Sequence, residues 1–164
     1  MFTDQQLALA EAVLDACRQA GLRIAVAESC TGGLVAGCLT AVAGSSDVVE
    51  RGFVTYTNEA KQEMLGVPAA LFADGGPGAV SEEVARFMAE GALANSPADL
   101  GLAVTGVAGP TGGTAEKPIG LVHIAGARKG AETLSEQHRF DGDRDSVRMQ
   151  SVTVALAMVK RLAG

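Results

Sequence analysis

The chain has 164 residues, of which 48% are hydrophobic, and its formal net charge at pH 7 is −6. This length suits one domain with a substantial buried core. The acidic balance argues against direct nucleic-acid binding and against a membrane-surface protein, because both need a basic face. A small-molecule partner, with a local basic site for an anion, is compatible with it.

The chain has three cysteines, Cys17, Cys30 and Cys38, and no C-x-x-C pair. An odd number without that spacing argues against a disulfide framework and against a zinc site. The N-terminus has no charged-then-apolar signal pattern, and no apolar run is long enough to span a bilayer. We therefore expect a soluble cytoplasmic protein without a metal.

The pattern of apolar and turn residues predicts strands alternating with helices, and then a hairpin. In chain order the predicted elements are a helix from Thr3 to Gly21, a strand over 22–27, a helix over 34–42, a strand over 48–57, a helix over 58–65, a helix from Ser81 to Asn95, a strand over 100–105, paired strands over 119–127 and 132–140, and a helix over 144–162.

Local capping signals support several of these boundaries. Thr3 and Gln6 have the spacing of a reciprocal capping box. Gly21 and Gly66 stand where a helix ends in a left-handed residue. Ser81 is a good N-cap, because its hydroxyl can accept a hydrogen bond from a first-turn amide.

This order of elements predicts a single domain over residues 1–164, folded as a three-layer α/β/α sandwich with a mixed β-sheet. The order of the strands in the sheet cannot be read from the sequence. The small-residue, apolar helices over 34–42 and 152–159 fit the sandwich core and a homo-oligomer interface equally well.

Ser29 is the sharpest candidate nucleophile, because it follows an apolar strand and precedes a helix. Ligands of open α/β sheets bind beyond the carboxyl ends of strands, where helix N-terminal amides can stabilise an oxyanion. Gly32 and Gly33 would let a substrate approach the backbone closely. A role for Ser29 or Thr31 as a mere helix cap fits their position equally well.

A serine nucleophile needs a base. His123 and His138 fall in the predicted hairpin, away from any Gly-rich segment, and the G-x-S-x-G elbow of Ser-His-Asp hydrolases is missing. Lys61 follows the second strand and is the better base, because desolvation or nearby positive charge can lower the pKa of a lysine. A surface lysine beside Glu59 is the alternative.

Three neighbours of this pair have candidate roles. Tyr56, the sole tyrosine, could relay a proton or hold the pair, and Asn58 could orient a substrate amide. Cys30 is a rival nucleophile, since a helix N-terminus lowers the pKa of a thiol. No histidine lies near Cys30 in the sequence, and cysteine commonly packs among small residues. We therefore expect Cys30 to pack beside the nucleophile and line the substrate site.

A second Gly-rich segment, residues 105–114, also follows a strand. Its residues Thr105, Gly106, Gly112 and Gly113 could cradle phosphate or carboxylate oxygens through backbone N–H groups. The spacing fits neither a P-loop nor a dinucleotide fingerprint. A long structural turn is the alternative, although a loop of this length in a compact domain more often serves a function.

Two arginines of the last predicted helix, Arg144 and Arg148, share one face at i,i+4. They could bind a nucleotide phosphate through paired hydrogen bonds. A solvated face, on which both arginines pair with Asp141, Asp143 and Asp145, fits the sequence at least as well.

Together these segments resemble the family of CinA C-terminal domains, which also occur alone as nicotinamide-nucleotide amidases. The matching stretches are residues 27–33, 56–61, 78–84, 104–110 and 116–120, followed by residues 142–144 and Arg148 on the terminal helix. The resemblance covers nearly the whole chain, with the motifs in the same order. Each motif alone is a weak signal, but the ordered set is specific for this family.

The resemblance implies hydrolysis of nicotinamide mononucleotide to nicotinate mononucleotide and ammonia, without a metal or another cofactor. The family's serine nucleophile falls on Ser29 and its lysine base on Lys61, with Tyr56 alongside and Thr105 lining the site. The amides near Gly32 and Gly33 would hold the oxyanion.

Two departures from the family pattern affect the second Gly-rich segment, where Thr111 and Ala115 replace the expected Gly and Pro. The alternative function is a non-catalytic module that binds a nucleotide or serves a partner in DNA uptake or repair. The intact pair of Ser29 and Lys61 argues against it, because binding alone would not require both side chains.

Overall fold

Apolar and β-branched segments build a five-stranded sheet in the order β2-β1-β3-β4-β5. The computed structural model describes residues 1–164. β1 pairs in parallel with β2 and β3, whereas the β3–β4 and β4–β5 pairs are antiparallel. The sheet is therefore mixed, as predicted. The strands are β1 (Ile24–Glu28), β2 (Val49–Val54), β3 (Leu100–Gly106), β4 (Leu121–Arg128) and β5 (Leu134–Arg139).

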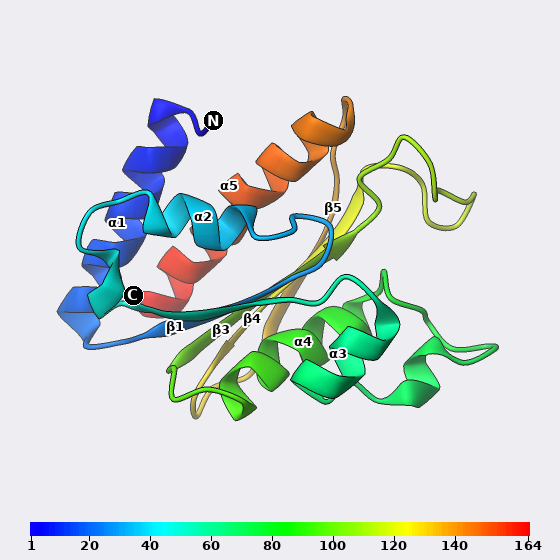
Figure 1. Ribbon diagram of the computed structural model, residues 1–164, viewed down its shortest axis with the longest axis horizontal. Coiled ribbons are helices and arrows are strands. Elements are labelled where there is room, and N and C mark those ends of the chain that lie inside the picture. Colours follow the sequence, from blue (N-terminus) through cyan, green and yellow to red (C-terminus); the bar gives the residue numbers. More distant parts are fainter.

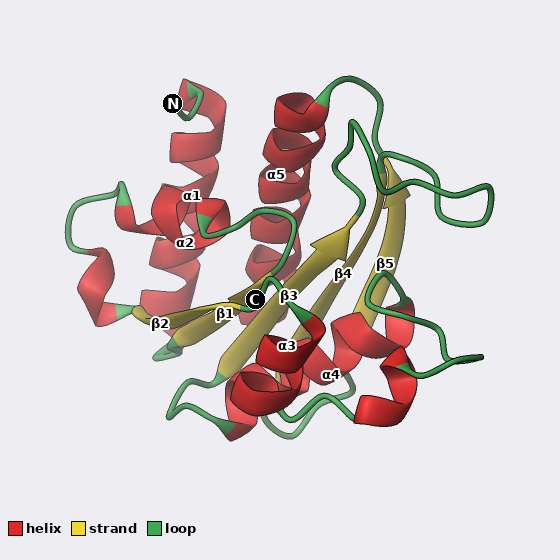
Figure 2. Cartoon of the chain, turned by 45° about the vertical axis from the view of Figure 1, so that its right-hand side comes forward, coloured by secondary structure: helices red, strands yellow, loops and turns green.

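Two layers of helices cover this sheet (Figure 1). The helices are α1 (Asp4–Ala20), α2 (Leu34–Thr40), α3 (Asn58–Leu65), α4 (Glu82–Ala94) and α5 (Arg144–Ala163), with short 3-10 turns η1 (Ser45–Asp47) and η2 (Ala69–Phe72). Helices α1, α2 and α5 lie on one face, and α3 and α4 on the other (Figure 2). The fold is the predicted α/β/α sandwich. None of its helices is both long and apolar enough to cross a membrane.

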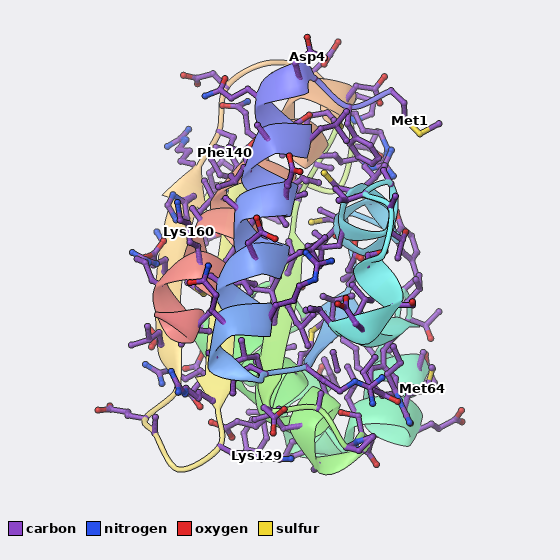
Figure 3. The ribbon with its side chains drawn as sticks, turned by 90° about the vertical axis from the view of Figure 1, so that its left-hand side faces the viewer. Met1, Asp4, Met64, Lys129, Phe140 and Lys160 are labelled. Carbon is purple, nitrogen blue, oxygen red and sulfur yellow. The ribbon has the colours of Figure 1, made fainter.

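Each helical layer encloses an apolar core against the sheet. The larger core joins α1, α2 and α5 to the sheet, and includes Leu14, Leu102 and Leu156. The smaller core lies under α4 and is built mostly of alanines, with Met88 at 0% exposure. From the side of α1, Figure 3 shows this helix in front of the sheet, with α5 on one side and α2 on the other. Burial on both faces explains the unbroken apolar runs of the central strands.

The helix boundaries follow the capping signals in the sequence. The amide of Gln6 donates to Thr3 Oγ1 at 3.2 Å, and the amide of Thr3 donates to Gln6 Oε1 at 3.1 Å. Gly21 and Gly66 end α1 and α3 with φ of 66° and 68°. The Ser81 hydroxyl accepts from the Val84 amide at 3.3 Å. Local side-chain chemistry thus fixes these ends, as predicted.

The second strand is shorter than the predicted range 48–57. β2 ends at Val54, and the chain then turns so that the Thr57 hydroxyl caps α3 by accepting from the Ala60 amide at 3.0 Å. The amide of Thr55 still donates to the Glu28 carbonyl at 2.9 Å. Residues 55–57 therefore leave the sheet beside the end of β1, where they can take part in a site.

Candidate active site

The carboxyl ends of three parallel strands meet at one edge of the sheet. Glu28, the last residue of β1, is in register with Val54 of β2 and with Val104 of β3. This edge therefore brings together Ser29 after β1, Tyr56 after β2 and Thr105 near the end of β3. This is the edge at which open α/β sheets bind ligands.

Lys61 and Ser29 form a hydrogen-bonded pair at this edge. Lys61 Nζ lies 3.1 Å from Ser29 Oγ and donates to the Thr55 carbonyl at 2.7 Å. The side chain of Lys61 extends from the first turns of α3 into the site and is only 1% exposed. The sequence-based prediction paired these two residues through family resemblance, and the fold places them in contact.

The environment of Lys61 shifts its protonation equilibrium towards the neutral amine. Burial lowers the pKa of Lys61 from its ordinary value of 10.5, and the neighbouring Cys30 thiol opposes this shift only as the lesser influence. A buried ammonium is disfavoured because it loses hydration without a carboxylate partner. In its neutral form an amine has one lone pair, which is what a general base needs.

The turn after Ser29 is held by hydrogen bonds within the protein. Gly32 and Gly33 have φ of 58° and 100°, which glycine adopts without strain. The amide of Gly32 donates to the Ser29 carbonyl at 3.0 Å, and the amide of Gly33 donates to Glu28 Oε2 at 3.0 Å. Both amides already have acceptors, so the oxyanion role expected of them would require these bonds to break.

The N-terminus of α2 is likewise occupied. The Glu28 carboxylate also accepts from the Val35 amide at 3.1 Å and from the Ala36 amide at 2.9 Å. A carboxylate in this position satisfies first-turn amides and complements the helix dipole. Neither Ser29 nor Thr31 is therefore the cap of α2. The hydroxyl of Thr31 is buried and has no hydrogen-bond partner.

Cys30 brings a thiol and a backbone amide close to Ser29. Its thiol is buried, and burial raises the pKa of that thiol from 9.0 to about 11. At neutral pH it is therefore a poor source of thiolate. The backbone amide of Cys30 makes no hydrogen bond within the protein, whereas the Ser29 amide donates to the Val104 carbonyl at 2.9 Å. The amide of Thr31 likewise has no acceptor, and of these two free donors that of Cys30 is the one next to the serine.

A cavity of about 280 Å³ opens over the pair. The ends of β1 and β3, the start of α3, the loop before α4 and the start of α5 all contribute to its wall. The lining residues are Ser29, Cys30, Tyr56, Lys61, Ala79, Val80, Thr105, Gly106, Val107, Ala108, Gly109, Thr111, Gly112 and Arg144. The side chain of Thr105 is fixed there, because its hydroxyl donates to the Ala79 carbonyl at 2.8 Å.

Arg144 and Tyr56 form the charged and aromatic part of the wall. Arg144 Nη2 donates to the Tyr56 hydroxyl at 2.9 Å, and Arg144 Nη1 donates to the Gly109 carbonyl at 2.8 Å. Tyr56 is 59% exposed. Its hydroxyl is thus bonded to Arg144 rather than to Ser29 or Lys61. This geometry suits the binding of an anionic group better than proton transfer within the pair.

Five of the predicted substrate-binding residues lie outside the cavity wall, namely Thr31, Gly32, Gly33, Asn58 and Gly113. Asn58 is an exposed residue at the first position of α3. Gly113 packs against Ile119, where an added Cβ would lie 3.0 Å from the Ile119 amide nitrogen. The Gly-rich segment therefore contributes Thr105, Gly106 and Gly112 to the wall, while Gly113 serves packing.

Two contributions to the site were not predicted from the sequence: one is a residue, and the other is the role of a residue already named. The Glu28 carboxylate, 1% exposed, is one, and a charge inside an apolar strand could have signalled it. The other is Arg148, whose Nε donates to the Cys30 carbonyl and Nη2 to the Thr31 carbonyl, both at 3.1 Å. The two arginines of this helical face thus play different parts. Arg144 lines the cavity, whereas Arg148 holds two backbone carbonyls and lies 4.0 Å from Asp145.

Neither histidine takes part in the site. His123 is buried on β4 opposite Thr105, and burial lowers its pKa. His138 on β5 lies 2.8 Å from Glu136 and stacks on Phe140. No group of three or more His, Cys, Asp and Glu side chains is placed to hold a metal ion. Both histidines therefore lie outside the set of residues that line the cavity.

Known proteins are similar to this chain in sequence and in fold. The model of the CinA C-terminal domain family matches residues 6–163. A CinA-like protein from Anaeromyxobacter dehalogenans is 52% identical over 141 residues, which are 85% of this chain and 34% of that relative. The chain thus spans about a third of the length of such curated relatives.

Solved structures agree over the whole chain. A competence/damage-inducible protein from Agrobacterium tumefaciens superposes with a TM-score of 0.96 at 47% identity, and the match covers 100% of this chain and 99% of that one. A competence damage-inducible protein from Klebsiella pneumoniae gives a TM-score of 0.90 at 36% identity over 95% of both chains. The chain belongs to the CinA C-terminal domain family.

Proposed function

We propose that the chain is an amidohydrolase that converts nicotinamide mononucleotide to nicotinate mononucleotide and ammonia. The observation that carries the proposal is the 3.1 Å contact between Lys61 Nζ and Ser29 Oγ, made by a lysine whose pKa burial lowers. Nucleophile and base in hydrogen-bond reach are the signature of covalent catalysis by serine. The choice of substrate follows the family resemblance.

The first half of the reaction forms an acyl-enzyme. Neutral Lys61 accepts the proton of Ser29, and Ser29 Oγ attacks the carboxamide carbon. The resulting oxyanion accepts a hydrogen bond from the Cys30 amide, which lies next to the nucleophile and has no acceptor within the protein. Protonated Lys61 then gives its proton to the amine as the C–N bond breaks, and ammonia leaves.

The second half releases the acid. Lys61, neutral again, takes a proton from a water molecule, and the hydroxide attacks the ester carbonyl. The C–O bond to Ser29 breaks, Ser29 Oγ regains its proton from Lys61, and nicotinate mononucleotide departs. The Thr55 carbonyl, 2.7 Å from Lys61 Nζ, keeps the amine in place through both halves.

The cavity fits this assignment of groups. With about 280 Å³ it can enclose the pyridine ring and carboxamide over Ser29, while the rest of a nucleotide extends to the mouth. Arg144 at the wall supplies a permanent positive charge for the phosphate. The partner is thus a small nucleotide, and the proposal involves no cofactor, nucleic acid or membrane.

Ammonia release from a panel of pyridine carboxamides tests the proposal. The panel contains nicotinamide, nicotinamide riboside and nicotinamide mononucleotide, assayed with the parent chain and with Lys61→Met. We expect release from the mononucleotide above all, and none from the Lys61→Met chain. Tight binding of the mononucleotide without release from any member would overturn the proposal and favour the non-catalytic binding module.

A further inference from the structure

The five residues Ser29–Gly33, here named the nucleophile turn, are held from both sides by charged side chains. Glu28 accepts from backbone amides at the C-terminal side of the turn, and Arg148 donates to backbone carbonyls in its middle. These side chains come from positions far apart in the chain, one at the end of β1 and one on α5.

The carboxylate of Glu28 is fully committed to backbone amides. Its Oε2 accepts from Gly33 at 3.0 Å and from Val35 at 3.1 Å, and its Oε1 accepts from Ala36 at 2.9 Å. At 1% exposure this charge has lost its hydration. These three bonds and the positive end of α2 are what compensate it.

Glu28 also fixes the other half of the catalytic pair through its backbone. The Glu28 carbonyl accepts from the Thr55 amide at 2.9 Å. The Thr55 carbonyl in turn accepts from Lys61 Nζ at 2.7 Å. Glu28 thus acts on both partners of the 3.1 Å contact between Ser29 and Lys61. Its side chain holds the turn that carries Ser29, and its backbone carbonyl holds the peptide unit that orients Lys61.

The guanidinium of Arg148 orients the peptide units beside the free amide of Cys30. Its two bonds, both 3.1 Å, reach the carbonyls of Cys30 and Thr31. The fork of an arginine can span two neighbouring carbonyls, which the single ammonium of a lysine cannot do in the same way. The nearest carboxylate, Asp145, is 4.0 Å away and largely exposed, so Arg148 is engaged chiefly with the turn.

We propose that Glu28 and Arg148 are positioning residues for the Ser29–Lys61 reaction, acting as a two-sided clamp on the nucleophile turn. The inference rests on the proposed function, because it assumes that Ser29 is the nucleophile. The clamp aims Ser29 Oγ at Lys61 and holds the Cys30 amide where the oxyanion forms. Neither side chain lines the cavity, so substrate affinity does not depend on them directly.

Two conservative variants test the clamp on the full chain. Glu28→Gln keeps the size of the side chain, but replaces one acceptor oxygen by an NH₂ group that faces an amide donor. Arg148→Lys keeps the charge but loses the fork. Each should lower kcat by up to about 100-fold, the cost of misplacing reacting groups by about 1 Å, and leave KM nearly unchanged.

The matched controls are Arg128→Lys and Glu90→Gln. Arg128 Nη1 also donates to a backbone carbonyl, that of Leu162, and Glu90 accepts from the Thr133 hydroxyl. Neither residue belongs to the site, so both controls should keep the parent kcat and KM. Because the two clamp residues hold the same turn, the double variant should lose less than the product of the two single losses.

Amide hydrogen exchange measures the clamp without any reaction. In Glu28→Gln the amides of Gly33, Val35 and Ala36 should exchange faster than in the parent, whereas they should not in the controls. Unchanged exchange at these amides would overturn the clamp. Faster exchange with an unchanged kcat would overturn its positioning role. If Glu28→Gln does not fold, Arg148→Lys tests the positioning role instead, because Arg148 is half-buried on α5. A lower kcat with an unchanged KM supports that role, and an unchanged kcat overturns it.

A parent chain that hydrolyses none of the carboxamides would overturn the proposed function, not the clamp. The positioning role is then tested by the rate at which a fluorophosphonate labels Ser29, measured in place of kcat. Slower labelling of both clamp variants than of the controls supports the positioning role, and equal labelling overturns it.

Discussion

The side chain of Lys61 donates to the Thr55 carbonyl at 2.7 Å, and this bond decides what the amine can do for Ser29. In its neutral form the amine has two N–H groups and one lone pair. One N–H is committed to Thr55, while Ser29 Oγ lies 3.1 Å from the same nitrogen. The lone pair is then free to take the serine proton, which is the arrangement that a Ser-Lys mechanism requires.

Cys30→Ala separates the two candidate nucleophiles. Because burial raises the pKa of the Cys30 thiol to about 11, its thiolate is scarce at neutral pH. The proposed contribution of Cys30 is its backbone amide, which the alanine variant retains. We expect kcat for ammonia release to stay within about threefold of the parent, since the change removes only packing next to the turn. A loss as large as that of Ser29→Ala would identify a thiol mechanism instead.

The pH dependence of kcat/KM reports the protonation of Lys61. The proposed base is active when neutral, and burial places the pKa of Lys61 below 10.5 in the folded chain. kcat/KM should therefore rise with pH through this lowered pKa and level off above it. Lys61→Arg, whose guanidinium stays protonated, should lose about 10²- to 10⁴-fold at every pH, the usual contribution of a general base. An unchanged rising limb in Lys61→Arg would assign the pH dependence to another group.

Tyr56→Phe tests whether the tyrosine transfers protons or only positions a partner. Its hydroxyl accepts from Arg144 at 2.9 Å, so the variant removes one exposed hydrogen bond. That loss corresponds to about 1 kcal/mol, or roughly fivefold in kcat/KM, mostly through KM for the mononucleotide. Steady-state kinetics with nicotinamide mononucleotide and with nicotinamide riboside, which lacks the phosphate, would check this. A fall in kcat by two orders of magnitude would instead show a chemical role.

Gly91→Ala tests how the packing of α3 against α4 supports the site. A Cβ at Gly91 would overlap the Leu65 carbonyl oxygen and lie 2.9 Å from its carbon, at the end of the helix that carries Lys61. We expect the free energy of unfolding in urea to fall by about 1–3 kcal/mol, together with kcat. Gly37→Ala on α2 is the control, since its Cβ would meet only Phe2 at 3.7 Å. Equal stability of Gly91→Ala and the parent would contradict this packing account.

The fold could be predicted where short-range chemistry decides it. The capping box of Thr3 and Gln6 and the left-handed glycines Gly21 and Gly66 depend only on neighbours along the chain, and they appear as predicted. The order of the strands depends instead on pairings between distant segments, such as Glu28 with Val54 and with Val104. No local signal encodes which apolar strand will lie next to β1, so the sequence left the order open.

The site shows the same division. Ser29 could be located because a hydroxyl after an apolar strand has a known position in α/β sheets. The engagement of the Gly33 amide with Glu28 could not, because it depends on the direction of a buried side chain. Arg144 and Arg148 share a helical face in the sequence, yet Arg144 reaches Gly109 while Arg148 reaches Cys30. Tertiary packing gave two equivalent arginines different partners.

The most direct test of the account is ammonia release from nicotinamide mononucleotide by the parent chain and by Ser29→Ala, prepared and assayed side by side. We expect one ammonia and one nicotinate mononucleotide per substrate consumed by the parent, and a loss of at least about 10⁴-fold in kcat on removal of the nucleophile. Release by Ser29→Ala at the parent rate would contradict it.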